Sequence, residues 1–380
     1  MQPGLGHYDI AVIGAGIAGA SVAAELSEHA RVVLLERESQ PGYHTTGRSA
    51  AIYSPIYGPQ PIRALTRAAR GFFESPPDGF AAHPLLAPIN AVFVARADQE
   101  ASLAAMQAEL DDAETVSRID RAEAEAEVPL LRRGYAIGAL RDTGTSDIDV
   151  AALHQGYLRL FRALGGTVLT AHAVTGLEQD AAGWQVETAK GRLHATTVVN
   201  AAGAWAEELG RMVGAEAIGL SPKRRTALMV DAPEGTHTGG MPLVIDIDEQ
   251  FYLKPDAGRL LISPANEDPE APCDVQPDEM DIAICVDRIE SAFDISIRRI
   301  GNSWAGLRSF VADKSPVAGF SRKVDRFYWL AGQGGYGIQS APALAQLAAS
   351  EVLGRSLPAH IAAEGLEPET LRPWRAGIGA

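Results

Sequence analysis

The stretch VIGAGIAG, residues 12–19, decides the fold, because it is a glycine-rich turn directly after a run of strand-forming residues. Its glycines, Gly14, Gly16 and Gly19, have the G-x-G-x-x-G spacing. In a βαβ unit the first glycine permits the tight turn, the second lets the backbone approach a pyrophosphate, and the third packs the helix on the strand. The turn therefore predicts a dinucleotide site, but it does not say which dinucleotide is bound.

The residues on either side of the turn complete a βαβ unit. Residues 8–13 are typical of a buried parallel strand, 17–28 of a helix, and 32–35 of a second strand that ends at Glu36. A carboxylate at this position, 17 residues after Gly19, can accept hydrogen bonds from both ribose hydroxyls and would repel a 2′-phosphate. Strand, helix, strand and terminal acid together favour a nucleotide site over a plain βαβ unit.

Two later segments repeat this pattern: 196–209 is typical of a strand and a turn, and 327–354 of a strand, a glycine turn and a long Ala-rich helix. A nicotinamide dehydrogenase usually completes its nucleotide domain in one contiguous stretch, whereas here the elements are scattered, which favours FAD. The helix after the second turn would direct N–H groups toward the negative charge of a reduced flavin ring. A simple helix entry is the alternative interpretation of that turn.

Segments of different character lie between these nucleotide-type elements. They carry alternating strand-like runs such as NAVFVAR and QFYLKPDAGRLLISP, which indicate an antiparallel sheet with one covered face. We expect an α/β chain with a Rossmann-like FAD-binding domain and a discontinuous α+β substrate domain. The FAD-binding domain is expected at 1–83, 147–218 and 307–380, and the substrate-binding domain at 84–146 and 219–306.

Composition restricts the class of protein. The 380 residues exceed the size at which one core usually stops growing, and 46% hydrophobic residues suffice for two cores. A formal charge of −15 argues against nucleic acid as a partner, because polyanions are bound through clustered Lys and Arg. The two cysteines, Cys273 and Cys285, have no CxxC spacing, so we expect neither a disulfide framework nor a metal site. With no signal peptide and no apolar run that could span a bilayer, we expect a cytoplasmic protein without a transmembrane segment.

Several longer strings carry a resemblance to a known family. DIAVIGAGIAGASVAAEL, VVNAAGAW, WAGLRSFVADKSPVAG and GQGGYGIQSAPALAQLAA resemble the D-amino-acid oxidase superfamily of FAD proteins, and the similarity runs over nearly the whole chain. Within this superfamily, strings such as TGRSAA, SPKRR, FYLKPDAG and LRSFVAD are most similar to bacterial D-arginine dehydrogenases. The resemblance implies a glutathione-reductase-type FAD-binding domain, noncovalent FAD and a D-amino acid as substrate.

The resemblance also implies which residues contact FAD. It places Glu36, Arg37 and Val174 at the adenosine end, the loop 45–51 along the isoalloxazine and pyrophosphate, and 334–339 at the pyrimidine edge of the flavin. The expected cofactor residues are Gly14, Gly16, Ala18, Gly19, Glu36, Arg37, Thr45, Thr46, Gly47, Arg48, Ser49, Ala50, Ala51, Val174, Gly203, Gln333, Gly334, Gly335, Tyr336, Gly337, Ile338 and Gln339.

The substrate residues follow from the same resemblance, and their chemistry suits an amino acid. Guanidinium forks hold a carboxylate well, and Arg225 and Arg308 match the family's two carboxylate-binding arginines. On residue type alone each would more often be a surface or ion-pair arginine, and tyrosines in such segments can be structural. The expected catalytic set is Tyr57, Arg225, Tyr252, Arg308, Gly335, whose carbonyl would accept from the substrate amine, and Gln339.

Two positions depart from the D-arginine dehydrogenase pattern. Ala91 stands where those enzymes carry a glutamate that pairs with the substrate guanidinium, and Ile52 replaces an active-site histidine. Both changes replace a polar side chain in the wall of the expected substrate pocket with an apolar one. Ile52 and Ala91 are therefore expected to line a side-chain pocket that prefers neutral, apolar groups over D-arginine and D-lysine. No residue stands out as the base that takes the proton of the substrate ammonium. His44 lies near the right loop, but we assign no residue to this role, and water or bulk solvent can take the proton.

The leading hypothesis is FAD-dependent oxidative deamination of D-amino acids. A hydride leaves Cα for the flavin N5, and the imino acid hydrolyses to a 2-oxo acid and ammonia. A glycine- or sarcosine-type amine oxidase is the alternative within the same fold. A flavoprotein that binds ligand without turnover is the alternative from another class, and its mark would be loss of the arginine pair. The electron acceptor, the exact substrate and the oligomeric state do not follow from the sequence.

Overall fold

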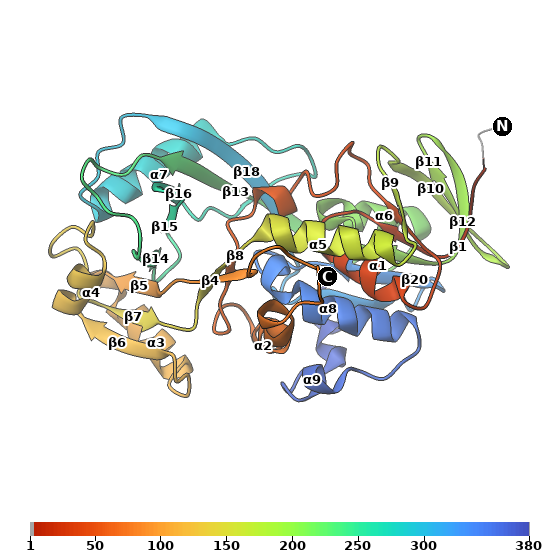
Figure 1. Ribbon diagram of the computed structural model, residues 1–380, viewed down its shortest axis with the longest axis horizontal. Coiled ribbons are helices and arrows are strands. Elements are labelled where there is room, and N and C mark those ends of the chain that lie inside the picture. The colour runs from red at the N-terminus through yellow and green to blue at the C-terminus, as the bar shows by residue number, and fades with distance from the viewer. Residues whose placement is uncertain (1–3, 380) are drawn as a thin grey trace.

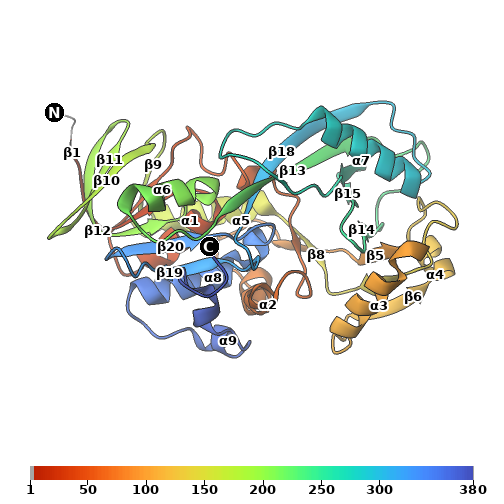
Figure 2. The ribbon, with the colours of Figure 1, turned by 180° about the vertical axis from the view of Figure 1, so that it is seen from behind.

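The computed structural model describes residues 4–379. Two large sheets occupy opposite ends of the long axis, and a small three-stranded sheet lies between them (Figure 1). The view from behind shows that strands from the first and last parts of the chain, β1 (Gly4–Ile13) and β20 (Phe327–Ala331), belong to the same end (Figure 2).

The first sheet combines a parallel set of strands, which includes one edge strand, with antiparallel strands at its other edges. Its further strands are β2 (Val32–Leu35), β9 (Thr167–Leu169), β10 (Val174–Asp180), β11 (Gly183–Thr188), β12 (Gly191–Asn200) and β19 (Val317–Phe320). The order is β10-β11-β12-β1-β2-β9, with β20 beside β12 and β19 beside β20. Val12 of β1 pairs in parallel with Val199 and with Leu34, and all three are fully buried, as expected for strands covered on both faces.

Helices cover both faces of this sheet. They are α1 (Ile17–Ser27), α2 (Gln60–Glu74), α5 (Val150–Ala163), α8 (Gly337–Val352) and α9 (Ala359–Ala362) on one side, and α6 (Ala206–Val213) on the other. Successive residues of β1 point to opposite faces, so Ile10 and Val12 pack in the core under α1, α5 and α8. Ala11 and Ile13 pack in the core under α6.

The second sheet lies at the other end of the molecule. Its strands are β5 (Ala91–Ala95), β6 (Val116–Asp120), β7 (Gly138–Asp142), β13 (Ser221–Val230), β14 (Leu243–Asp246), β15 (Tyr252–Asp256), β16 (Arg259–Ser263), β17 (Asp268–Pro269) and β18 (Ile300–Phe310). The order is β17-β13-β16-β15-β14-β5-β7-β6, with β18 also paired to β13. One face is covered by α7 (Glu279–Ala292) and the other by α3 (Glu100–Glu109), while α4 (Arg121–Glu127) packs beside β6 and β7.

The small sheet joins the two ends. It consists of β3 (Ile52–Tyr53), β8 (Ser146–Ile148) and β4 (Leu86–Pro88), in the order β3-β8-β4. Its strands come from the segments by which the chain passes from one large sheet to the other, and Figure 1 shows β4 and β8 in the middle of the molecule.

The predicted α/β class with its Rossmann-like unit is confirmed. The predicted starts of α1 and β2 agree with the structure, while β1 begins at Gly4, before the predicted strand. The second sheet is not purely antiparallel, because β5 and β14 run parallel. These strands come from distant parts of the chain, so no hairpin fixes their direction. The division into two domains stays a prediction; β18 continues past the expected boundary at 306.

No helix within residues 4–379 is both long and apolar enough to cross a membrane.

Candidate active site

The carboxyl ends of four parallel strands, β1, β2, β12 and β20, meet at one edge of the first sheet, where a cavity of about 420 Å³ opens. Open α/β sheets bind ligands at this edge. Each strand continues into a segment of the cavity wall. These segments are Gly14 and Gly16, then Glu36 and Arg37, then residues 201–205, and last residues 332–335.

The glycine turn after β1 is sterically required. Gly14 has a φ of 101°, and a Cβ added there would lie 2.4 Å from the carbonyl oxygen of Ala201. A Cβ on Gly19 would lie 1.7 Å from the carbonyl oxygen of Gly14, so Gly19 packs α1 against the turn rather than bordering the cavity. Thr46 fixes the start of α1, because its hydroxyl Oγ1 accepts a hydrogen bond of 2.9 Å from the N–H of Ile17.

Glu36 forms the end of the cavity nearest β2. Its side chain is buried, its Oε2 accepts from the N–H of Ala15 at 2.9 Å, and its Oε1 accepts from the N–H of Glu38 at 2.9 Å. A carboxylate oxygen has more than one acceptor site, so each can still receive a ribose hydroxyl. The position and orientation agree with the predicted adenosine contact.

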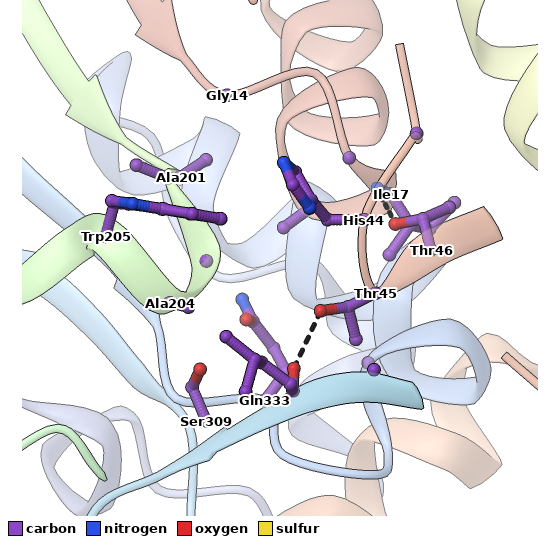
Figure 3. A pocket seen from close by; sticks show the side chains of 18 of the residues that line it. Gly14, Ile17, His44, Thr45, Thr46, Ala201, Ala204, Trp205, Ser309 and Gln333 are labelled. Carbon is purple, nitrogen blue, oxygen red and sulfur yellow. Dashed lines mark hydrogen bonds between the residues drawn. The ribbon is translucent and has the colours of Figure 1, made fainter. Parts of the chain in front are cut away.

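A tilted pair of rings borders the same end of the cavity. Figure 3 shows Trp205 and His44 facing one another, and their ring centroids lie 4.7 Å apart. The guanidinium of Arg37 lies 4.6 Å from the Trp205 ring, and Nε2 of His44 lies 3.0 Å from Oε1 of Glu38. His44 therefore belongs to the nucleotide cavity, where its partners hold it away from the role of a substrate base. The sequence analysis did not single out Trp205, although it follows a predicted cofactor glycine by two residues.

The far end of the cavity carries buried polar groups and the start of a helix. Within the described chain, Nε2 of Gln333 and the hydroxyl of Ser309 are buried and have no hydrogen-bond partner. α8 begins at Gly337 without a side-chain cap, and both Gly337 and Ile338 border the cavity. Unpaired donors and an open helix start match a flavin ring, which presents carbonyl oxygens and a ring nitrogen that gains charge on reduction. The residues present thus fit FAD.

Most of the predicted cofactor residues border this cavity. Those that do are Gly14, Gly16, Ala18, Glu36, Arg37, Thr45, Thr46, Arg48, Ser49, Ala50, Val174, Gly203, Gln333, Gly334, Gly335, Gly337 and Ile338. Ala51 and Gln339 instead border a second cavity, and the wall of neither cavity, as far as residues 4–379 form it, includes Gly19, Gly47 or Tyr336.

The second cavity, of about 60 Å³, adjoins the first and lies between the two large sheets. Ser49, Ala50, Arg225, Tyr252, Arg308 and Gly335 border both cavities. A small molecule in the second cavity would therefore lie next to the part of FAD that these shared residues contact.

The two arginines occupy one face of the second sheet. Arg225 of β13 pairs with Gly306 of β18, and Arg308 lies two residues farther along β18, so the two side chains are diagonal neighbours. Nε of Arg225 donates to the carbonyl of Asn266 at 2.8 Å, and its NH2 nitrogen lies 3.4 Å from Glu267. The guanidinium of Arg308 makes no hydrogen bond or ion pair with residues 4–379.

These two like charges favour an anion between them. Burial, and then the charge of Arg308, lower the pKa of Arg225. A guanidinium keeps its proton even so, and two of them in a cavity removed from water gain strongly from a bound carboxylate.

Tyrosine and glutamine donors surround the arginines. Burial, and then the charge of Glu249, raise the pKa of Tyr57, so its hydroxyl stays protonated and can donate. Gln339 is 2% exposed; its Oε1 accepts from the N–H of Ser54 at 2.9 Å, while its Nε2 has no partner within the described chain. The predicted catalytic residues Tyr57, Arg225, Tyr252, Arg308, Gly335 and Gln339 all border the second cavity.

The remaining wall of the second cavity is mixed. Ile52 borders it, with Leu243 and Ile245 of β14. Ala91 is fully buried and pairs with Leu243, so it points to the same face of the sheet, and it packs in the same cluster as Ile52. The cavity wall as the structure describes it does not include Ala91.

Two charged residues of this wall were missed by the sequence analysis. Lys254 follows Tyr252 by two residues, and the period-2 alternation of a strand could have placed both on the same face. Glu249 lies in the loop between β14 and β15, is exposed, and has a φ of 54°, which no sequence pattern indicates.

Comparisons with known proteins agree with this geometry. A family model described as FAD dependent oxidoreductase (DAO) matches residues 9–351. Glycine oxidase from Bacillus licheniformis is 24% identical over 360 residues, which cover 92% of this chain and 94% of that protein. Mitochondrial dimethylglycine dehydrogenase from Mus musculus is 26% identical over 265 residues, which cover 65% of this chain but only 30% of that protein. The crystal structure of glycine oxidase from Geobacillus kaustophilus has a TM-score of 0.82 at 23% identity and covers 92% of this chain and 95% of that chain.

Proposed function

Because the chain belongs to the family of FAD-dependent oxidoreductases, we propose that it oxidatively deaminates D-amino acids with neutral, apolar side chains. The observation that carries the proposal is Arg308, a cation at the junction of the two cavities whose guanidinium makes no hydrogen bond or ion pair with residues 4–379. The substrate α-carboxylate would supply the missing negative charge, in a bidentate pair with the guanidinium.

The residues of the chain bind and orient the substrate. Arg308 and Arg225 hold the carboxylate, and the protonated hydroxyl of Tyr57 donates to it. The carbonyl of Gly335 accepts from the substrate amine, which fixes Cα toward the nucleotide cavity. When bound, FAD supplies the acceptor for the hydride that leaves Cα. The amine must be neutral at that moment, and because His44 lies in the other cavity, the ammonium proton would pass to solvent.

The apolar part of the wall supports the side-chain preference. Ile52, Leu243 and Ile245 would contact the substrate side chain. Burial of each CH₂ there gains roughly 0.8 kcal/mol. A charged side chain would lose its hydration at this wall, and the carboxylate of Glu249, which also borders the cavity, is exposed and screened by water.

A glycine- or sarcosine-type amine oxidase is the second candidate. Two observations favour it, namely the small volume of about 60 Å³ and the similarity to glycine oxidase and dimethylglycine dehydrogenase. Glycine and dimethylglycine are achiral, so the names of these relatives give no indication of D or L stereochemistry.

An anaerobic titration of the purified flavoprotein separates the candidates. D-leucine, L-leucine, glycine and sarcosine are added in turn, and the loss of the visible flavin absorbance is followed. We expect D-leucine to bleach the flavin faster than the other three. Faster bleaching by sarcosine or glycine would favour the second candidate, faster bleaching by L-leucine would contradict the stereochemistry, and no bleaching by any of them would indicate a protein that binds ligand without turnover.

A further inference from the structure

One partner of an ion pair, Lys254, borders the second cavity, and the other partner, Asp147, lies behind it. Lys254 borders the cavity, is 5% exposed, and lies on β15 two residues after Tyr252, on the same face of the strand. Its Nζ donates to Oδ1 of Asp147 at 2.6 Å. The ammonium is therefore almost wholly removed from water and depends on one carboxylate.

Asp147 comes from the small sheet and not from the sheet that carries Lys254. It lies on β8 and pairs with Ile52 of β3, which borders the same cavity. Its side chain is 37% exposed. The pair thus bridges two sheets beside the apolar part of the wall, where the substrate side chain is expected.

The pair contributes no net charge to that wall. The other charged groups of the cavity have different positions: Arg225 and Arg308 face the α-carboxylate, and Glu249 is exposed, so water weakens its field. A side-chain carboxylate would compete with Asp147 for Lys254, and a side-chain ammonium would compete with Lys254 for Asp147. Either one enters the cavity at the cost of its hydration and of an existing ion pair.

We infer that the Lys254–Asp147 pair is a specificity-determining element that restricts the proposed deaminase to neutral side chains. The inference rests on the proposed function. It implies that removal of the Asp147 charge turns the same wall into a site for an acidic side chain, because Lys254 then has no counter-charge of its own.

The test compares two side chains of nearly equal shape, D-glutamate and D-glutamine. The ratio of kcat/KM for D-glutamate to that for D-glutamine is measured at pH 7 in the unaltered protein, in Asp147→Asn and in the double variant Asp147→Asn with Lys254→Met. We expect a ratio well below one in the unaltered protein, a rise of about tenfold or more in Asp147→Asn, and a return to the low value in the double variant. An unchanged ratio in Asp147→Asn, or a raised ratio that survives in the double variant, would overturn the inference.

Two further measurements keep the test decisive. If Asp147→Asn fails to fold or to bind flavin, Lys254→Met alone decides: with Asp147 left unpaired, D-lysine should gain severalfold over D-norleucine, and no gain would overturn the inference. If the unaltered protein turns over no D-amino acid, the proposed function fails by itself. The dissociation constants of glutarate and its monoamide are then read from the change in flavin absorbance, and the ratio of the constant for glutarate to that for the monoamide should fall in Asp147→Asn and return in the double variant.

Discussion

At the scale of single residues, the two arginines of the site differ in how they are held. The guanidinium of Arg308 makes no hydrogen bond or ion pair with residues 4–379, whereas Arg225 is anchored to Asn266 and Glu267. We predict that Arg308→Ala lowers kcat/KM for D-leucine by a factor that corresponds to a loss of about 2 to 5 kcal/mol of binding free energy, because a desolvated carboxylate loses its partner. Flavin content and thermal stability should hardly change, and Arg298→Ala, at an exposed position, is the matched control. An unaltered KM in Arg308→Ala would remove this residue from the substrate site.

The side-chain preference is also decided by individual residues. We predict that D-arginine and D-lysine have lower kcat/KM than D-leucine, D-methionine and D-phenylalanine, because the wall beside Ile52 is apolar and the carboxylate of Glu249 at the same cavity is exposed and screened by water. A panel of initial rates checks the order. A higher kcat/KM for D-arginine than for D-leucine would contradict it, and Glu249→Gln would then show whether the exposed carboxylate at this cavity supplies the counter-charge.

At the scale of the elements, a side chain is excluded at the turn between β1 and α1 but is tolerated near the end of α2. A Cβ at Gly14 would lie 2.4 Å from a backbone oxygen, and its φ of 101° disfavours any side chain. We predict that Gly14→Ala destabilises the protein by at least about 1 to 3 kcal/mol and lowers its flavin content. Gly71 of α2 has no atom within 4 Å of an added Cβ, so Gly71→Ala should stabilise by about 0.5 to 1 kcal/mol. Thermal unfolding of both variants tests the contrast, and equal shifts of the same sign would refute it.

Helix α1 also carries a carboxyl group that titrates near neutral pH. Burial, with a smaller contribution from Glu28, raises the pKa of Glu25 to about 7 from its ordinary 4.5, against an opposing hydrogen bond from Gln346. The folded protein therefore holds this proton more tightly than the unfolded chain. The stabilisation is complete below pH 4.5 and is lost as the pH rises through 7. We predict that Glu25→Gln raises the free energy of unfolding by up to about 3 kcal/mol at pH 8 and has little effect near pH 5. Denaturant unfolding at the two pH values measures this, and an equal effect at both would show that Glu25 does not titrate in this range.

At the scale of the whole molecule, the cofactor is enclosed by segments from both ends of the chain. No cysteine borders the nucleotide cavity within residues 4–379, and His44 is engaged by Glu38 and Trp205. We therefore predict that the protein purifies yellow and that acid precipitation releases FAD into the supernatant. Yellow colour that stays with the precipitate would indicate a covalent bond instead.

The sequence predicted those parts of the site that depend on local steric and periodic rules. The glycine turn, the acid at Glu36 and the start of α8 follow from such rules, and the resemblance added Arg225 and Arg308. Contacts between distant strands could not be predicted in this way. To predict the Lys254–Asp147 pair, one would have to know the strand register in two different sheets. To predict that the guanidinium of Arg308 makes no hydrogen bond or ion pair with residues 4–379, one would have to know the positions of all its neighbours. The parallel pairing of β5 with β14 is likewise set by the folded core and not by any adjacent turn.

The wall of the nucleotide cavity extends from Ile13 to Ile338, and this spread has a consequence for biosynthesis. The first βαβ unit leaves the ribosome early, but the last part of the cavity wall, within residues 332–338, is complete only after β20 and the start of α8 have been synthesised. Until then, the apolar residues of β1 and α1 that later lie under α8 are covered only in part, by α5. Such exposed surface is prone to aggregation, so the nascent chain is expected to depend on chaperones and to acquire FAD only after translation is almost complete.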